Sequence, residues 1–586
     1  MEPKHYTNER SQQIVISVLK AHGIRKVVAS PGTTNVTLVG SMQNDPWFEM
    51  FSSVDERSAA YLACGLAAES GEAVVLTCTG ATASRNYLSG LTEAYYRKLP
   101  ILAITANQGK ANVGHLVPQN IDRSKTLADV VKMSVQIEYT HPDDSEEEWY
   151  HTVLANKAVL ELFHHGGGPV HINLSTRYSK NFSVEKLPDT QIIRRYMPYD
   201  KMPTIPEGRI AVFVGSHKLF SPKETDSIDF FCATHDAVVI TDHTSGYHGK
   251  YAVNFAIIGG QRIYKSPLRN FRLLIHIGEV SGDYYGCSIA PQEVWRVSED
   301  GEIRDRYMKL SSVFEMPEAV FFNHYSEQGA LHNEAITEYR ATYSEYMKQI
   351  PDLPFSNAWI ASQIADKFPE KSSIHFGILN SLRSWNWFNL PESVTSYSNV
   401  GGFGIDGGIS SLIGASLYNP NQLYFVVLGD LAFFYDMNVI GNRHVGNNVR
   451  ILLVNNGRGS EFRLFSHPCY QWGERADDYM AAARHYGIQS PKLVKDYAEN
   501  LGYEYLSAPS KEEFLNQYQR FIVPEVTDKP MIFEVFTSPS DESKALELIT
   551  SCVEKPVGDK IKDSIKDIIR SVVPKNVISS AKQMLK

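Results

Sequence analysis

The stretch YFVVLGDL at residues 424–431 is an apolar, β-branched run that ends in glycine and aspartate. The stretch RILLVNNG at residues 450–457 repeats this design, with two asparagines after its apolar run. Both runs are typical of strands buried on both faces of a parallel sheet. Residues 432–448 between them are long enough for one crossover helix. The two stretches therefore predict a βαβ unit within an α/β domain.

Polar side chains stand where both predicted strands end. Such sheets bind ligands just outside the carboxyl ends of their strands, which is where Asp430 and Asn456 are expected. Carboxylate and amide oxygens suit Mg²⁺ while the ion also holds phosphate groups. The pair of stretches thus resembles the metal and diphosphate motif of thiamine diphosphate (ThDP) enzymes. Either stretch alone is more typical of an ordinary core strand with a polar end, and only the pair favours the metal and diphosphate motif.

The bulk composition is that of a globular protein. The chain has 586 residues, too many for one hydrophobic core, so about three domains are expected. A net charge of −9 argues against nucleic acid as the main partner. Six scattered cysteines without a C-x-x-C pair favour a reduced, cytoplasmic protein. The sequence shows no signal peptide and no apolar stretch of membrane-spanning length, so no membrane span is expected.

We predict a fold of three doubly wound α/β domains with parallel sheets. The first covers residues 1–190, a central domain covers residues 191–350, and the third covers residues 351–550. Strand ends rich in glycine, serine and asparagine recur in the first and third domains and suggest a duplication. Residues 551–586 predict a basic amphipathic tail that packs on its own protein rather than on a membrane or partner.

A G-x-G-x-x-G pattern at Gly402, Gly404 and Gly407 makes a dinucleotide-binding oxidoreductase an alternative. A dinucleotide site needs these glycines directly behind the first strand of its unit. Residues 394–400 are interrupted by polar side chains, which argues against a strand there. The pattern also leaves Asn456 without a role. We therefore favour the metal and diphosphate interpretation.

ThDP chemistry needs a second group, an acid that hydrogen-bonds the aminopyrimidine ring so that this ring can remove the C2 proton. Glu56 is a candidate, because it opens a predicted helix of small apolar residues within SVDERSAA at residues 53–60. Acidic side chains are also common at the start of an ordinary solvated helix. Glu56 alone therefore does not decide between the two interpretations.

Eight short motifs, taken together, resemble those of one family. Their order and spacing are similar to the MenD family, the 2-succinyl-5-enolpyruvyl-6-hydroxy-3-cyclohexene-1-carboxylate synthases, within the acetolactate synthase and pyruvate decarboxylase superfamily. The resemblance covers about residues 10–545 and excludes the basic tail. The motifs are SPG (30–32), VDERS (54–58), CTGATAS (78–84), EAYY (93–96), NS (380–381), SN (398–399), GIDG (404–407) and GDL (429–431).

This resemblance implies a ThDP-binding fold, ThDP and Mg²⁺ as cofactors, and a homodimer or homotetramer. Glu56 would be the acid at the aminopyrimidine and would meet the diphosphate site of another subunit. Asp430, Asn456 and the carbonyl of Arg458 would hold Mg²⁺. Ile405 would force ThDP into its bent shape. The resemblance also implies cofactor contacts from Gly404, Asp406, Gly429 and Leu431, and places Gln119 and Ser381 near the reacting carbons.

The substrate pocket departs from the family pattern. The MenD family binds polyanionic substrates with several arginines, and a charged hydrogen bond to a carboxylate contributes roughly 1.5–3 kcal/mol. Loss of most of them would abolish recognition of those acids. At the corresponding positions this chain has Thr33 and Thr34, Gln108, Val400 and approximately Trp385, with Arg383 nearby.

The loop NNGRGSEFR at residues 455–463 stands where the substrate would bind, and Glu461 is its best candidate for a substrate-side acid or base. A surface loop with solvated charges is the alternative. We predict a ThDP- and Mg²⁺-dependent enzyme that decarboxylates a small 2-oxo acid such as pyruvate and protonates the carbanion or adds it to an acceptor carbonyl. A MenD-type synthase with an altered pocket and a non-catalytic ThDP-fold protein are further alternatives.

Overall fold

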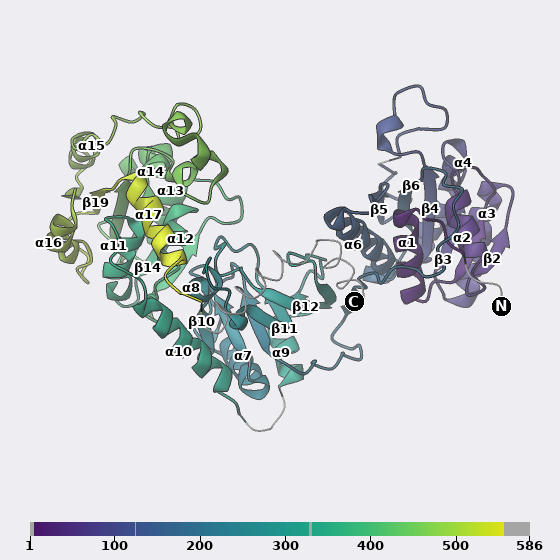
Figure 1. Ribbon diagram of the computed structural model, residues 1–586, viewed down its shortest axis with the longest axis horizontal. Helices are drawn as coiled ribbons and strands as arrows, with labels where there is room; N and C mark the ends of the chain where they lie inside the picture. Colours follow the sequence, from purple (N-terminus) through teal and green to yellow (C-terminus); the bar gives the residue numbers. More distant parts are fainter. Residues whose placement is uncertain (1–4, 124, 327–330, 556–586) are drawn as a thin grey trace, which may run out of the picture. The chain divides into compact units, whose positions relative to one another are not determined.

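The computed structural model describes residues 5–123, 125–326 and 331–555, which divide into two compact units (Figure 1). The first unit comprises residues 1–202 and 294–316, and the second comprises residues 203–293 and 317–586. Most of the predicted basic tail, residues 556–586, lies outside the described residues.

The first unit contains a six-stranded parallel sheet with the strand order β2-β1-β3-β4-β6-β5. Val27 and Leu102 face the apolar core that helices α1 and α6 share, while Val28 and Ala103 face the core of α3 and α5. The sheet is therefore covered on both faces. Its elements are α1 (Arg10–Ala21), β1 (Lys26–Ala29), α2 (Val36–Gln43), β2 (Glu49–Ser52), α3 (Glu56–Ser70), β3 (Val74–Cys78), α4 (Thr82–Asn86), α5 (Leu88–Arg97), β4 (Ile101–Asn107), β5 (Met133–Ile137), α6 (Ser145–Glu161) and β6 (Val170–Ser175).

The second unit contains a sheet with the order β15-β14-β16-β17-β19-β18, again parallel throughout. Numbered within each sheet, this order and that of the first unit both read 2-1-3-4-6-5, a shared plan that supports the suggested duplication. The elements are α11 (Asn357–Ile364), β14 (Ser373–Phe376), α12 (Asn380–Trp385), β15 (Thr395–Ser398), α13 (Gly408–Ser416), β16 (Tyr424–Gly429), α14 (Asp430–Asp436), β17 (Val449–Asn455), α15 (Leu493–Asn500), β18 (Glu504–Ala508), α16 (Lys511–Phe521), β19 (Met531–Phe536) and α17 (Pro539–Thr550).

The remaining strands make up the central α/β region. The boundary between the two units falls within strand β12. In the second unit the strand order is β10-β9-β8-β11, and in the first it is β12-β13-β7, with parallel neighbours. The predicted fold class, three doubly wound parallel sheets of a ThDP-binding fold, is confirmed. The elements are β7 (Arg194–Tyr196), β8 (Ile210–Val214), α7 (Pro222–His235), β9 (Val238–Thr241), β10 (Ala252–Asn254), α8 (Ala256–Gly259), β11 (Asn270–Ile277), β12 (Ala290–Ser298), β13 (Leu310–Glu315), α9 (Glu318–Tyr325) and α10 (Glu334–Lys348).

The expected crossover helix is present but short, and one other local expectation was wrong. The crossover between β16 and β17 begins at Asp430 and is α-helical only to Asp436, after which it continues as the 3₁₀-helix Met437–Gly441. A strand, β15, does precede the glycine pattern at residues 402–407. It lies at the edge of its sheet and pairs only with β14, so its polar residues need not be buried on both faces.

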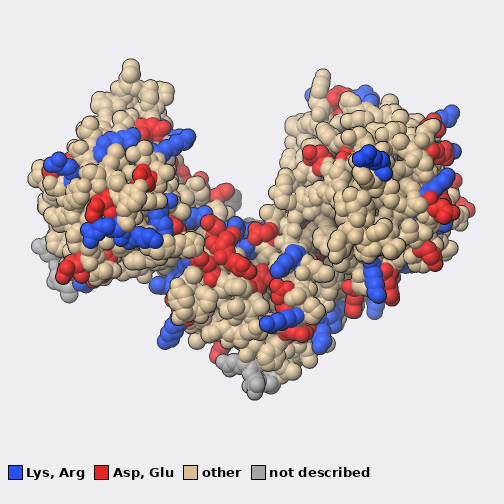
Figure 2. All heavy atoms as spheres, turned by 180° about the vertical axis from the view of Figure 1, so that it is seen from behind, with Lys and Arg blue, Asp and Glu red and all other residues tan. Residues whose placement is uncertain are grey.

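The face of the molecule shown in Figure 2 carries both positive and negative side chains. On the face shown in Figure 2, Lys and Arg side chains are interspersed with Asp and Glu side chains. Within the described residues, every helix is either too short or too polar to cross a bilayer.

Candidate active site

A cavity of about 110 Å³ lies beyond the paired carboxyl ends of β16 and β17, where Gly429 and Val454 are neighbours in register. Strands of a parallel sheet end at one edge, so their following residues meet there. The structure thereby brings together eight of the predicted site residues, from segments up to 80 residues apart in the sequence (381 to 461). The eight that line the cavity are Ser381, Ile405, Gly429, Asp430, Leu431, Asn456, Arg458 and Glu461.

Asp430 is a buried carboxylate at the first position of α14, only 4% exposed. Loss of water on burial raises its pKa from 3.8 to about 7, although the backbone N–H groups of Leu431 and Gly457 act in the opposite direction. The negative charge of Glu534 raises this pKa further. A divalent cation would offset both effects, since a bound ion stabilises the ionised carboxylate. The site therefore fits Mg²⁺.

The two asparagines after β17 take different places. Asn455 donates from Nδ2 to Oε1 of Glu534 at 2.7 Å, inside the sheet, and is 3% exposed. Asn456 lines the cavity together with Asp430, and its Oδ1 accepts a long 3.4 Å hydrogen bond from the N–H of Arg458. The amide oxygen of Asn456 is thus the better placed of the two to hold a cation.

The ionisation of Asp430 gives a testable pH dependence in the cofactor-free protein. Because folding raises the pKa of Asp430 from 3.8 to about 7, the neutral carboxyl group favours the folded state. The stabilisation of the folded state by the neutral carboxyl group is complete below about pH 4 and is lost as the pH rises through 7. Relative to Asp430→Asn, the free energy of unfolding of the wild type should fall by up to about 3 kcal/mol between pH 5 and 8.

Urea unfolding of both proteins across this pH range measures the difference. Saturating Mg²⁺ and ThDP should abolish the trend, because the cation stabilises the ionised form. If the free energies of unfolding of wild type and Asp430→Asn change in parallel with pH, the assigned burial of this carboxylate is contradicted.

Glu461 lies in the 3₁₀-helix Ser460–Arg463 and forms a two-pronged ion pair with Arg383. Nη1 of Arg383 donates to Oε2 at 2.7 Å, and Nη2 donates to Oε1 at 3.2 Å. The same loop contains two further arginines, and both Arg458 and Arg463 pair with Asp477. The predicted alternative of freely solvated charges therefore does not describe this loop.

Ser381 and its neighbour Asn380 on α12 are held by buried and partly buried hydrogen bonds. The hydroxyl of Ser381 accepts from Nδ2 of Asn357 at 3.3 Å, and Nδ2 of Asn380 donates to Oε2 of Glu542 at 3.0 Å. Gly404 and Asp406 lie outside the set of residues that line the cavity, and the side chain of Asp406 is exposed. Their proposed cofactor contacts remain a prediction.

Glu56 lies in the first unit, where it opens α3 behind the capping residue Asp55. Its side chain is partly buried, and its Oε2 accepts from Nδ2 of Asn86 at 3.4 Å. The Cys78 thiol at the end of β3 has a pKa raised to about 12. Burial is the largest cause, and the nearby negative charge of Glu56 makes a smaller contribution in the same direction. The sequence thus places a carboxylate at the carboxyl edge of the first sheet.

Gln119 lies in an exposed turn after β4, with a positive φ of 64°. A side chain at Gly80, just beyond β3, would come within 2.9 Å of the Gln119 carbonyl oxygen, so only glycine permits this approach. The loop of Gln119 therefore packs at the same edge of the first sheet as the end of β3.

Arg383 was not predicted as a site residue. Its position two residues after Ser381 on one short helix was a signal that could have identified it.

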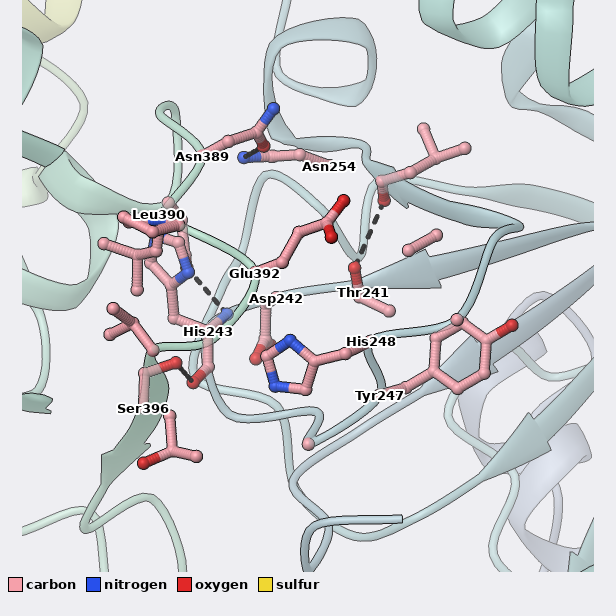
Figure 3. Close-up of a pocket in the computed structure, with 18 of the residues that line it drawn as sticks. Thr241, Asp242, His243, Tyr247, His248, Asn254, Asn389, Leu390, Glu392 and Ser396 are labelled. Carbon is pink, nitrogen blue, oxygen red and sulfur yellow. Dashed lines mark hydrogen bonds between the residues drawn. The ribbon is translucent and has the colours of Figure 1, made fainter. Parts of the chain in front are cut away.

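A second cavity of about 500 Å³ was also not predicted (Figure 3). It lies at the carboxyl end of β9, and the side chains of Glu392 and His248 point toward it. Nδ2 of Asn254 donates across it to Oδ1 of Asn389 at 3.2 Å. It shares no lining residue with the Asp430 cavity.

Comparison with known proteins supports the resemblance. The N-terminal TPP binding domain of thiamine pyrophosphate enzymes matches residues 10–126. The 2-succinyl-5-enolpyruvyl-6-hydroxy-3-cyclohexene-1-carboxylate synthase of Bacteroides fragilis is 29% identical over 568 residues, covering 92% of this chain and 98% of the relative. The enzyme of the same name from Bacteroides thetaiotaomicron is 28% identical over 575 residues, with the same coverage.

A solved structure, the thiamine diphosphate-dependent 4-hydroxybenzoylformate decarboxylase of Rhodococcus jostii RHA1, aligns with 90% of this chain and 99% of that chain. Its TM-score of 0.40 and identity of 15% are too low to support a conclusion about function. The resemblance predicted from the motifs is confirmed by the family and the curated relatives, and it extends over most of the chain.

Proposed function

We propose that this chain, a MenD-like thiamine diphosphate-dependent enzyme, uses ThDP and Mg²⁺ to decarboxylate a small 2-oxo acid and then protonates the product or joins it to an acceptor carbonyl. The observation that carries the proposal is the buried carboxylate of Asp430 beside Asn456 at the ends of two parallel strands. When bound, ThDP supplies the electron sink that accepts the pair released with CO₂.

The residues of the chain have separate roles in this proposal. Asp430, Asn456 and the carbonyl of Arg458 hold Mg²⁺ and through it the diphosphate, because hard oxygen ligands suit this ion. Ile405 lines the same cavity and supports the bent cofactor. Glu56 holds a proton at the aminopyrimidine ring. By the family resemblance, the enzyme is a homodimer or homotetramer in which Glu56 serves the diphosphate site of another subunit.

The side chains that stand at the positions of the family arginines support a small, weakly charged substrate. Thr34 is buried, and its hydroxyl is engaged by Oγ1 of Thr79 at 2.6 Å and the carbonyl of Ala106 at 3.2 Å. Trp385 and Val400 are buried apolar side chains, 0% and 3% exposed. Gln108 hydrogen-bonds the hydroxyl of Tyr178. These four side chains carry no positive charge for a polyanionic substrate.

A MenD-type synthase with an altered pocket is the second candidate. The observation that favours it is the similarity to synthases over 92% of the chain. The two candidates differ in the anionic groups that the substrate must present, so substrate turnover separates them.

The purified enzyme with ThDP and Mg²⁺ should release CO₂ from pyruvate or another small 2-oxo acid, and it should not convert isochorismate plus 2-oxoglutarate. The physical reason is that uncharged side chains replace the carboxylate-binding arginines. A panel of 2-oxo acids, with ¹³CO₂ release followed by NMR, measures the first part, and product analysis by mass spectrometry measures the second. Efficient formation of the synthase product would contradict our interpretation of the pocket, and a lack of CO₂ release from every 2-oxo acid would contradict the proposed reaction.

A further inference from the structure

We infer that Glu461 is a built-in counter-ion for Arg383, and that this pair restricts the donor to 2-oxo acids that lack a second carboxylate. The inference rests on the proposed function, because it names the substrate class of the same site. It also assigns Glu461 a role in specificity in place of the acid or base role expected from the sequence.

Arg383 is a buried cation that needs a partner. Its side chain is 6% exposed, and a guanidinium group stays protonated in proteins. The ring of Tyr284 lies 5.6 Å from its Cζ atom and adds only a weak attraction. Asp283 is also near, but burial raises the pKa of this carboxyl group to about 7, so near neutral pH it is only partly ionised. The main partner of Arg383 is therefore Glu461.

Glu461 is the member of this pair that lines the cavity, and Arg383 is not among the lining residues. Its carboxylate engages both terminal nitrogens of Arg383, the arrangement by which arginine recognises a substrate carboxylate. The side chain of Glu461 is 21% exposed and lines the cavity with Asp430 and Ser381. The carboxylate of the chain thus occupies the two donors that a carboxylate on the substrate would need.

The other two arginines of the Glu461 loop are also paired. Arg458 and Arg463 share the buried carboxylate of Asp477, with Nη1 of Arg463 at 3.1 Å. Arg383 is therefore paired with Glu461, and Arg458 and Arg463 share Asp477. A second carboxylate on the donor would have to displace Glu461 from Arg383, and it would meet the negative charge of Glu461 as it did so.

The test compares wild type with Glu461→Gln, in which the size of the side chain and one hydrogen-bond acceptor are kept while the charge is lost. The measured quantity is the ratio of kcat/KM for 2-oxoglutarate to kcat/KM for pyruvate. The ratio should rise about 10- to 100-fold in Glu461→Gln, because Arg383 then has a free charge for the distal carboxylate. Glu504→Gln is the matched control, since Glu504 pairs with Arg520 in an exposed part of the same domain, and it should leave the ratio unchanged.

The outcomes separate the inference from the proposed function. An equal loss of kcat/KM for both donors in Glu461→Gln would identify Glu461 as an acid or base and overturn the inference, while the proposed function stands. A wild-type enzyme that uses 2-oxoglutarate as well as pyruvate would also overturn it, and this measurement needs no folded variant. Failure of the wild type to release CO₂ from any 2-oxo acid would overturn the proposed function and the inference with it.

Discussion

Asp430→Ala should lower the affinity for ThDP by at least about 100-fold in the presence of Mg²⁺. Asp430 is the charged group of the proposed metal site, and its removal leaves the amide of Asn456 and one backbone carbonyl to hold the cation. Mg²⁺ links the protein to the diphosphate, so weaker metal binding weakens cofactor binding. Isothermal titration calorimetry of the cofactor-free protein with ThDP at fixed Mg²⁺ measures the change.

Asp528→Ala is a matched control, because Asp528 is an exposed aspartate on the loop before β19 of the same domain. It should leave ThDP affinity unchanged. Since the buried carboxylate of Asp430 is itself costly to ionise, Asp430→Ala should fold well at neutral pH. Unchanged ThDP binding by a folded Asp430→Ala protein would show that the diphosphate site lies elsewhere.

Glu56→Gln should slow hydrogen exchange at C2 of bound ThDP by roughly 10²–10⁴-fold, the usual contribution of general acid–base assistance. Glutamine keeps the size of the side chain and one hydrogen-bond acceptor, but it has no acidic proton to share with the aminopyrimidine. ThDP should still bind, since the proposed diphosphate and metal contacts come from Asp430 and Asn456. Exchange in D₂O, stopped by acid and followed by NMR, measures the rate.

Glu69→Gln offers a control, because Glu69 lies near the other end of α3 and is exposed. Fast exchange in the wild type that only Glu56→Gln removes would support an active enzyme. If the wild type with ThDP bound also exchanges slowly, a non-catalytic ThDP-fold protein becomes the better interpretation.

Much of the fold could be predicted from local sequence. A strand buried on both faces must be apolar along its whole length, so β16 and β17 were visible as continuous runs that end in polar residues. The edge strand β15 was missed for the same reason, since an edge position tolerates the polar side chains of residues 395–398. Asp430 and Asn456 could be predicted as neighbours because parallel strands end at one edge of the sheet.

The sequence by itself determined the fold class, the resemblance to MenD and the absence of most family arginines, because each of these depends on residue type and order along the chain. Only the tertiary structure decided which groups meet. It turned Asn455 into the sheet and Asn456 toward the cavity, raised the pKa of Asp430 by burial, and paired Arg383 with Glu461 across 78 residues of sequence. Burial and ion pairing depend on atoms that approach in space, and a sequence pattern carries no distances between them.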